Sequence, residues 1–148
     1  MIGLNLVRLI EANSQELSRG LMQKLLSSDR ASDYHKVPHE EMQTAAIEIY
    51  QHLSDWLLTK TESDIELRYT QIGKRRAQQG VSLSHFIWAI TLTKEHLWAF
   101  LQREAVVDRV IELFGELELI RMLDRFFDSA LYYGTVGYER AARGAKAA

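Results

Sequence analysis

Histidines and arginines on one predicted helix are the side chains of this chain best placed to do chemistry. His85, His96 and Arg103 fall within a narrow sector of that helix, at about 100° per residue. Together they could bind a small anion or ligand, or form a pH-sensitive contact. They could also form a polar edge between two apolar faces, and the sequence favours this second interpretation.

Metal binding would require several ligands on one face, and the spacing of the candidates does not provide them. His35 and His39 are four residues apart, but Pro38 lies between them and disfavours helix at the preceding residue. A dinuclear carboxylate site in a bundle needs two Glu-x-x-His motifs, whereas Glu48 and His52 are spaced by four and have no second copy. The chain also has no cysteine, which excludes disulfides and cysteine-ligated zinc. We expect no metal site.

Enzyme motifs are also missing from the sequence. It contains no glycine-rich phosphate loop, no G-x-S-x-G elbow and no H-E-x-x-H motif. The basic run Lys74-Arg75-Arg76 could contact a phosphate, but we expect it to be the solvated end of a helix, where positive charge complements the helix dipole. The net charge of -2 argues against nucleic acid or an anionic membrane as the main partner.

The elements that must position these residues are predicted to be helices. One proline and eight glycines in 148 residues leave long uninterrupted windows, and strand-like alternation is absent. We predict an all-α, five-helix bundle forming a single domain over 1–148. Its first helix covers about 4–26, its core helices about 38–133, and a small basic tail 134–148, with a loop over 27–37.

Caps and breaks set the predicted helix boundaries. Asn13 and Ser14 could divide the first helix, because such side chains compete for backbone hydrogen bonds. A capping box beginning at Ser63 predicts a third helix from 64 to Gly80, where a left-handed cap suits glycine. Ser82 is the predicted N-cap of the fourth helix, and the fifth begins near 105 or 108 and runs at least to 133.

The fourth helix is predicted to be apolar on two faces. One face comprises Phe86, Ile90, Thr93, Leu97, Phe100 and Leu101. The opposite face carries Trp88, Leu92 and Ala99. A helix that is apolar on both sides is buried on both sides, either inside the domain or between subunits. We favour a homodimer interface, to which the wide apolar stripe of the fifth helix would also contribute. The residues predicted to form this interface are Trp88, Leu92, Phe114 and Leu117.

The most specific pattern lies between Leu67 and Leu101. It reads Arg76-Ala77-x-x-Gly80-Val81-x-Leu83, followed by an aromatic-rich helix that closes on Leu97-Trp98. This pattern resembles the N-terminal input domain of RsbR-type stressosome proteins, the RsbT co-antagonist (RsbRD) family. The resemblance implies structural roles for Arg76, Ala77, Gly80, Val81, Leu83 and Trp98.

The resemblance also implies a function. In the proteins that this chain resembles, the domain is a sensory module that dimerises and passes a signal through its final long helix to an output domain such as STAS. Its fold can be globin-like without haem. Since the chain ends near residue 148, we expect either a standalone module or a fragment of a longer regulator.

The expected function is therefore non-enzymatic bacterial signalling through a homodimer and contacts with other signalling proteins. We expect a cytoplasmic location without a membrane partner, because no targeting signal is visible and the longest apolar cluster, 86–92, is too short to span a bilayer.

The alternative is a helical module whose main task is to bind a small molecule, either haem or a metabolite. Its predicted pocket between the second, third and fourth helices would be lined by Tyr50, Trp56, Tyr69, His85 and His96. Haem would need a histidine facing an apolar pocket, whereas each candidate histidine has charged or polar neighbours. We therefore expect no cofactor, and the sequence names neither the stimulus nor the downstream partner.

Overall fold

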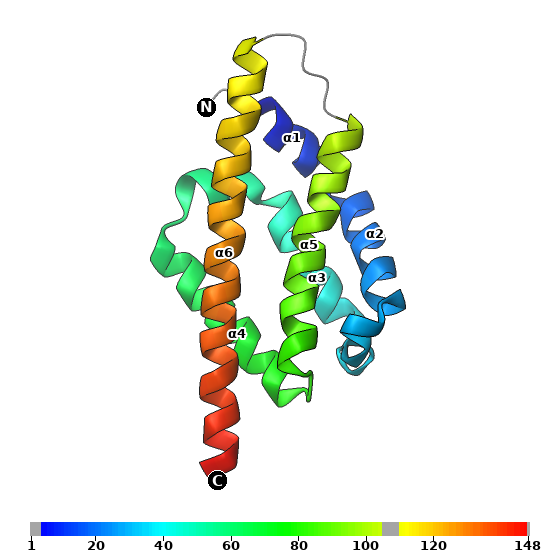
Figure 1. The fold of residues 1–148 in the computed structure, drawn as a ribbon, viewed down its shortest axis with the longest axis vertical. Coiled ribbons are helices and arrows are strands. Elements are labelled where there is room, and N and C mark those ends of the chain that lie inside the picture. The colour runs from blue at the N-terminus through cyan, green and yellow to red at the C-terminus, as the bar shows by residue number, and fades with distance from the viewer. Residues whose placement is uncertain (1–3, 105–109, 148) are drawn as a thin grey trace.

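Helices make up the fold of residues 4–104 and 110–147, the parts of the chain that the computed structural model describes (Figure 1). The α-helices are α1 (Leu4–Ala12), α2 (Ser14–Ser27), α3 (His39–Gln51), α4 (Glu62–Gln78), α5 (Leu83–Glu104) and α6 (Val110–Ala147). Between them lie a 3₁₀ segment, η1 (Asp29–Lys36), and a π-helical segment, η2 (Asp55–Thr59). The all-α prediction is confirmed, with more elements than the five helices expected and a last helix that extends beyond residue 133.

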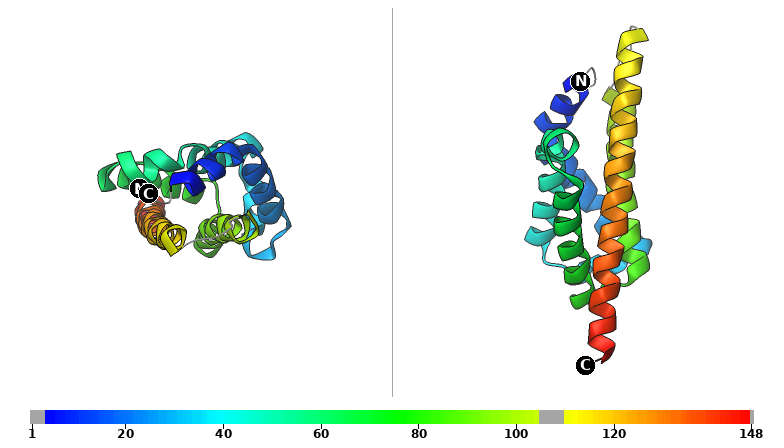
Figure 2. Two further views of the ribbon diagram at one scale, coloured as in Figure 1. Left: turned by 90° about the horizontal axis from the view of Figure 1, so that it is seen from above. Right: turned by 90° about the vertical axis from the view of Figure 1, so that its left-hand side faces the viewer.

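The helices form two layers, as Figure 2 shows. One layer holds α5 and α6, and the other holds α1, α3 and α4, while α2 packs against both α3 and α5. The 38 residues of α6 span ~57 Å at about 1.5 Å per residue. This helix runs the length of the molecule, and α4 lies beside part of it (Figure 1).

The end of α6 corrects the prediction of a separate basic tail over 134–148. Residues 134–147 continue α6, in which Gly137 is buried against α4 and Gly134 is buried between α4 and α5. The Tyr138 hydroxyl donates a hydrogen bond of 2.6 Å to the Val81 carbonyl oxygen. Glycine and alanine contribute little to an apolar stripe, so the sequence pattern did not indicate that this segment is packed.

The first 37 residues differ from the prediction in one respect. The division of the first helix is confirmed at Asn13, whose side-chain amide donates to the Leu9 carbonyl oxygen at 2.8 Å. The loop predicted over 27–37 is instead largely the 3₁₀ segment η1, which buries Ala31 and Tyr34. The segment is kinked at Ala31, whose φ of -131° and ψ of 22° are not helical.

Both ends of α4 are defined by local chemistry. Its capping box joins Thr61 and Asp64, two residues before the predicted box, because the Asp64 carboxylate accepts from the Thr61 backbone N–H at 2.8 Å. Gly80 has a φ of +79°, which confirms the predicted left-handed stop. Ser82 precedes α5, but its hydroxyl donates to the Asp33 carboxylate.

The core lies between the two layers. On α5 the predicted buried face is confirmed for Phe86, Thr93, Leu97, Phe100 and Leu101. The described part of α6 contributes to this core the buried hydrophobic residues Leu119, Leu123, Phe126, Phe127 and Ala130. By contrast, two aliphatic residues of α6 are exposed, Leu117, which was predicted to lie in a dimer interface, and Ile120. Among the described residues, no helix is both long and apolar enough to cross a membrane.

Candidate functional site

The three aromatic residues predicted to line a ligand pocket belong to the core. The Tyr50 hydroxyl donates to the Thr93 carbonyl oxygen at 2.9 Å, and the indole nitrogen of Trp56 donates to the Glu48 carbonyl oxygen at 3.1 Å. The ring centroids of Trp56 and Tyr69 lie 6.0 Å apart in an edge-to-face arrangement. Burial raises the pKa of both tyrosines, so their hydroxyls stay protonated.

His85 lies at the start of α5, in a polar cluster that fastens η1 to this helix. Its Nδ1 accepts a hydrogen bond of 3.1 Å from the Asp33 backbone N–H. The Asp33 carboxylate accepts from the Ser82 N–H at 2.9 Å and from the Ser82 hydroxyl. These two bonds from Ser82 lower the pKa of Asp33 to about 2. The cluster holds two segments together and encloses no cavity with the predicted aromatic residues.

His96 lies elsewhere, in a groove of about 300 Å³ between α2 and α5. Its Nε2 donates to the Leu17 carbonyl oxygen at 3.0 Å, and its Nδ1 is buried without a hydrogen-bond partner. Arg103 lines the same groove. The sector predicted from helical spacing is therefore divided: His96 and Arg103 share a site, and His85 belongs to another.

A second cavity lies at the centre of the domain. It has a volume of about 70 Å³, is partly open to solvent and is lined by residues of α2, η1, α3, α4 and α5. Its lining is mainly apolar, with Tyr34, Tyr69 and Arg76 among the polar exceptions. Of the five residues predicted to form one pocket, Tyr69 alone lines this cavity, while Trp56 lines a groove beside α6. The five residues do not meet at one site.

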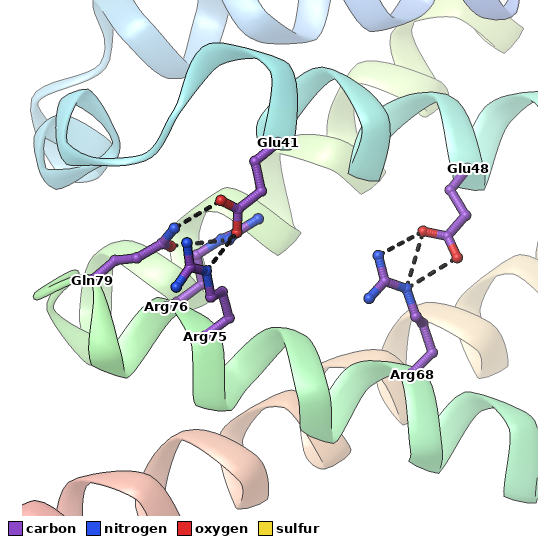
Figure 3. A network of polar contacts seen from close by, with 6 residues as sticks. All are labelled: Glu41, Glu48, Arg68, Arg75, Arg76 and Gln79. Atoms are coloured by element: carbon purple, nitrogen blue, oxygen red, sulfur yellow. Dashed lines mark hydrogen bonds and ion pairs between the residues drawn. The ribbon is translucent and has the colours of Figure 1, made fainter.

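Arg76 is the buried member of a polar network that joins α3 to α4 (Figure 3). Its guanidinium donates to Glu41 at 2.8 Å and to the side-chain oxygen of Gln79 at 3.0 Å. Arg75 and Gln79 donate to the same carboxylate at 3.1 and 2.9 Å. Burial acts to raise the pKa of Glu41, but the hydrogen bonds from Arg75 and Arg76 outweigh it and hold that pKa below its usual value.

The basic run is therefore only partly a solvated helix end. Lys74 and Arg75 are exposed, as expected, but Arg76 is 4% exposed, and its guanidinium lies 5.8 Å from the ring centroid of Tyr34. A parallel ion pair joins Arg68 to Glu48 through hydrogen bonds of 2.8 to 3.0 Å (Figure 3). Sequence reasoning did not assign the partners Glu41 and Arg68, because each pair links different helices.

The other residues implied by the family pattern lie around the same turn and along α5. Ala77 is half-buried near the end of α4, while Val81 is buried and accepts the hydrogen bond from Tyr138. Leu83 and Trp98 are half-buried against the core.

The predicted dimer residues have different surroundings. The indole nitrogen of Trp88 donates to the Ser28 hydroxyl at 3.2 Å. The guanidinium of Arg30, in η1, lies 4.7 Å from the centroid of the Trp88 ring. Trp88 and Leu92 are thus half-buried against their own chain. Leu117 is 51% exposed, whereas the side chain of Phe114 lies outside the described residues.

No arrangement for metal binding emerges in the described parts of the chain. No three histidine, aspartate or glutamate side chains there come together as a metal site. Glu48, a candidate ligand in the sequence, is held by Arg68. The described residues thus form an all-helical domain with interhelical ion pairs, a small cavity that is partly open to solvent, and surface grooves.

Comparison with known families identifies the protein family to which this domain belongs. The model of the RsbT co-antagonist protein RsbRD N-terminal domain matches residues 15–147, which run from the start of α2 to the end of α6. The chain belongs to this family of signalling input domains. No curated protein and no solved structure matches the chain, so the globin-like arrangement stays a prediction.

Proposed function

We propose that this chain is a non-enzymatic input domain of stressosome-type signalling, which acts in the cytoplasm as a homodimer and through contacts with other signalling proteins. Membership of the RsbRD N-terminal domain family supports the signalling role. The observation that carries the self-association is the exposure of Leu117 and Ile120, at 51% and 37%, on α6.

The position of these two side chains favours a helical contact. They are three residues apart and therefore lie on one face of α6. Leu119 and Leu123, on another face of the same helix, are fully buried in the domain. A helix held on one side with aliphatic residues on the other can pack against a second copy. A stable interface buries about 800 Å² per partner, so we place Leu117 and Ile120 within a larger contact surface.

The test is a charge substitution with a matched control. Leu117→Glu should weaken the dimer ~30-fold, as expected for the loss of a central contact worth about 2 kcal/mol. Leu67→Glu changes a leucine that is 62% exposed on α4 and should leave the dimer intact. Light scattering after size exclusion over a concentration series measures both. A wild-type monomer at all concentrations, or equal weakening by the two variants, would contradict the proposal.

We further propose that the domain works without haem. The residues lining the central cavity include no histidine, and the two histidines near α5 each hold a hydrogen bond within the domain. The protein mixed with haem should therefore show no saturable shift of the Soret band. A stoichiometric shift that is lost in His96→Ala would make haem sensing the function instead.

A further inference from the structure

The groove between α2 and α5 concentrates positive charge. Arg19 and Arg103 both line it, with Glu16 as the acidic side chain among its lining residues. In the described ranges Arg19 forms no ion pair, and the ion pair of Arg103 is with its neighbour Glu104, at 3.3 Å in an exposed position. In a chain of net charge -2, two such guanidinium groups in one groove create a local attraction for anions.

The floor of the groove is built around the imidazole of His96. A Cβ atom on Gly20 would lie 2.9 Å from two atoms of that ring, so glycine at this position gives the ring its space. The bond from Nε2 to the Leu17 carbonyl oxygen fixes the orientation of the ring. Buried polar atoms in proteins nearly always have partners, yet Nδ1 of His96 has none. Because Nε2 carries the proton, Nδ1 is an acceptor, so the ring shapes the groove and does not itself bond an anion.

The groove also has an apolar wall. Leu17 and Phe100 are buried core residues that contribute to its lining. The guanidinium of Arg103 lies 5.8 Å from the ring centroid of Phe100, so charge and carbon surface are adjacent. An inorganic anion would use the arginines alone, whereas an anion with a carbon chain would use both surfaces.

We propose that this groove binds a small organic carboxylate, with its carboxylate between Arg19 and Arg103 and its carbon chain against Leu17 and Phe100. Guanidinium groups bind carboxylates through paired, charge-assisted hydrogen bonds. Burial, followed by repulsion from Lys24 and Arg103, lowers the pKa of His96, so the imidazole is neutral and the two arginines carry the positive charge. The proposal rests on the signalling function for its biological meaning, because the carboxylate would then be the stimulus.

Butyrate is a suitable probe, and ¹H–¹⁵N NMR of the full chain is the measurement. Butyrate should shift the Gly20 amide and the His96 ring signals in a saturable manner, while uncharged butyramide should not. Arg19→Gln and Arg103→Gln should each raise the dissociation constant at least tenfold. Arg143→Gln removes the same charge from an exposed position on α6 and should leave binding unchanged.

Several outcomes would overturn the carboxylate proposal. Equal shifts with butyramide would show an apolar site, and saturation by inorganic phosphate but not butyrate would show a site for inorganic anions. Equal loss in Arg143→Gln would show general charge screening, and no shift at Gly20 or His96 would show no site. Since self-association is measured separately with Leu117→Glu, a failure here is distinguishable from a failure of the proposed function.

Discussion

Arg76 is a charged side chain inside the domain, and its burial is offset by its partners. Its guanidinium reaches Glu41 on α3 and Gln79 near the end of its own helix, and it lies near the ring of Tyr34. Since Arg76 joins α3, α4 and η1, we infer that it holds the turn between α4 and α5 against the first half of the chain.

The neighbouring arginines allow a matched test of this role. Arg76→Gln should lower the free energy of unfolding by about 2 kcal/mol, because hydrogen bonds to a buried charge are lost. Arg75→Gln removes an exposed partner of the same carboxylate and should cost less than about 1 kcal/mol. Urea unfolding followed by circular dichroism measures both, and equal losses would contradict a special role for Arg76.

His96 makes the stability of the domain depend on pH. Its pKa lies below the usual value of about 6.5, first because of burial and then because of Lys24 and Arg103. The unfolded chain therefore binds more protons in acid. The neutral ring contributes fully to the free energy of unfolding above about pH 6.5. This contribution is lost as the pH falls toward the lower pKa of the folded state.

We expect the melting temperature to depend less steeply on pH in His96→Gln than in the wild type. The melting temperature of the wild type should fall between about pH 7.5 and 5.5, and His96→Gln should remove part of that fall. His39→Gln, at an exposed position, should keep the wild-type slope. Thermal unfolding in buffers of constant ionic strength gives the comparison, and a steeper fall in His96→Gln would refute the assignment.

At the scale of elements, α4 and α6 approach so closely that their contact depends on glycine. A Cβ on Gly73 would lie 1.9 Å from the Gly134 carbonyl oxygen, and one on Gly137 would lie 2.2 Å from the Thr70 carbonyl oxygen. In both cases the obstacle is backbone, so the two helices would have to move apart to admit a methyl group.

Alanine substitutions test this contact, because the free energy of unfolding should fall for glycines inside it and stay equal or rise for a glycine outside it. Gly73→Ala and Gly137→Ala should each lower the free energy of unfolding by about 1–3 kcal/mol through overpacking. Gly144→Ala, also in α6 but with open space around it, should be neutral or stabilising by up to about 1 kcal/mol, since alanine favours helix. Destabilisation by Gly144→Ala equal to that by Gly73→Ala would attribute the effect to something other than close packing.

At the scale of the whole molecule, α6 connects regions that are far apart in the sequence. Near its end, the Tyr138 ring stacks on Phe86 with centroids 6.1 Å apart, while its hydroxyl bonds the turn at Val81. Nearer its start, Leu119 and Leu123 are buried in the main core. One helix thus stabilises both ends of the bundle.

Truncation measures how much the last turns contribute. A chain ending at residue 133 loses the glycine contact with α4 and the burial of Tyr138, and should lose at least about 3 kcal/mol of stability. A chain ending at residue 143 keeps both and should stay within about 1 kcal/mol of the wild type. Thermal unfolding by circular dichroism distinguishes them, and equal melting temperatures would restore the interpretation of 134–148 as a separate tail.

Local patterns in the sequence determined the class of fold and its main breaks. Helical spacing predicted the buried face of α5, Gly80 predicted the left-handed stop, and the motif from Arg76 to Leu83 indicated the family. These features depend on residues within a few turns of one another, and helix geometry relates such residues by a fixed rotation.

Only the tertiary structure decided which polar residues meet. Arg76 bonds a residue 35 positions away, and His96 bonds one 79 positions away, so no periodicity links these partners. The same holds for the packing of Gly134 and Gly137, which carry no apolar side chain but allow two backbones to touch. Helix periodicity identifies the face that a helix buries; the approach of other helices then determines what that face contacts.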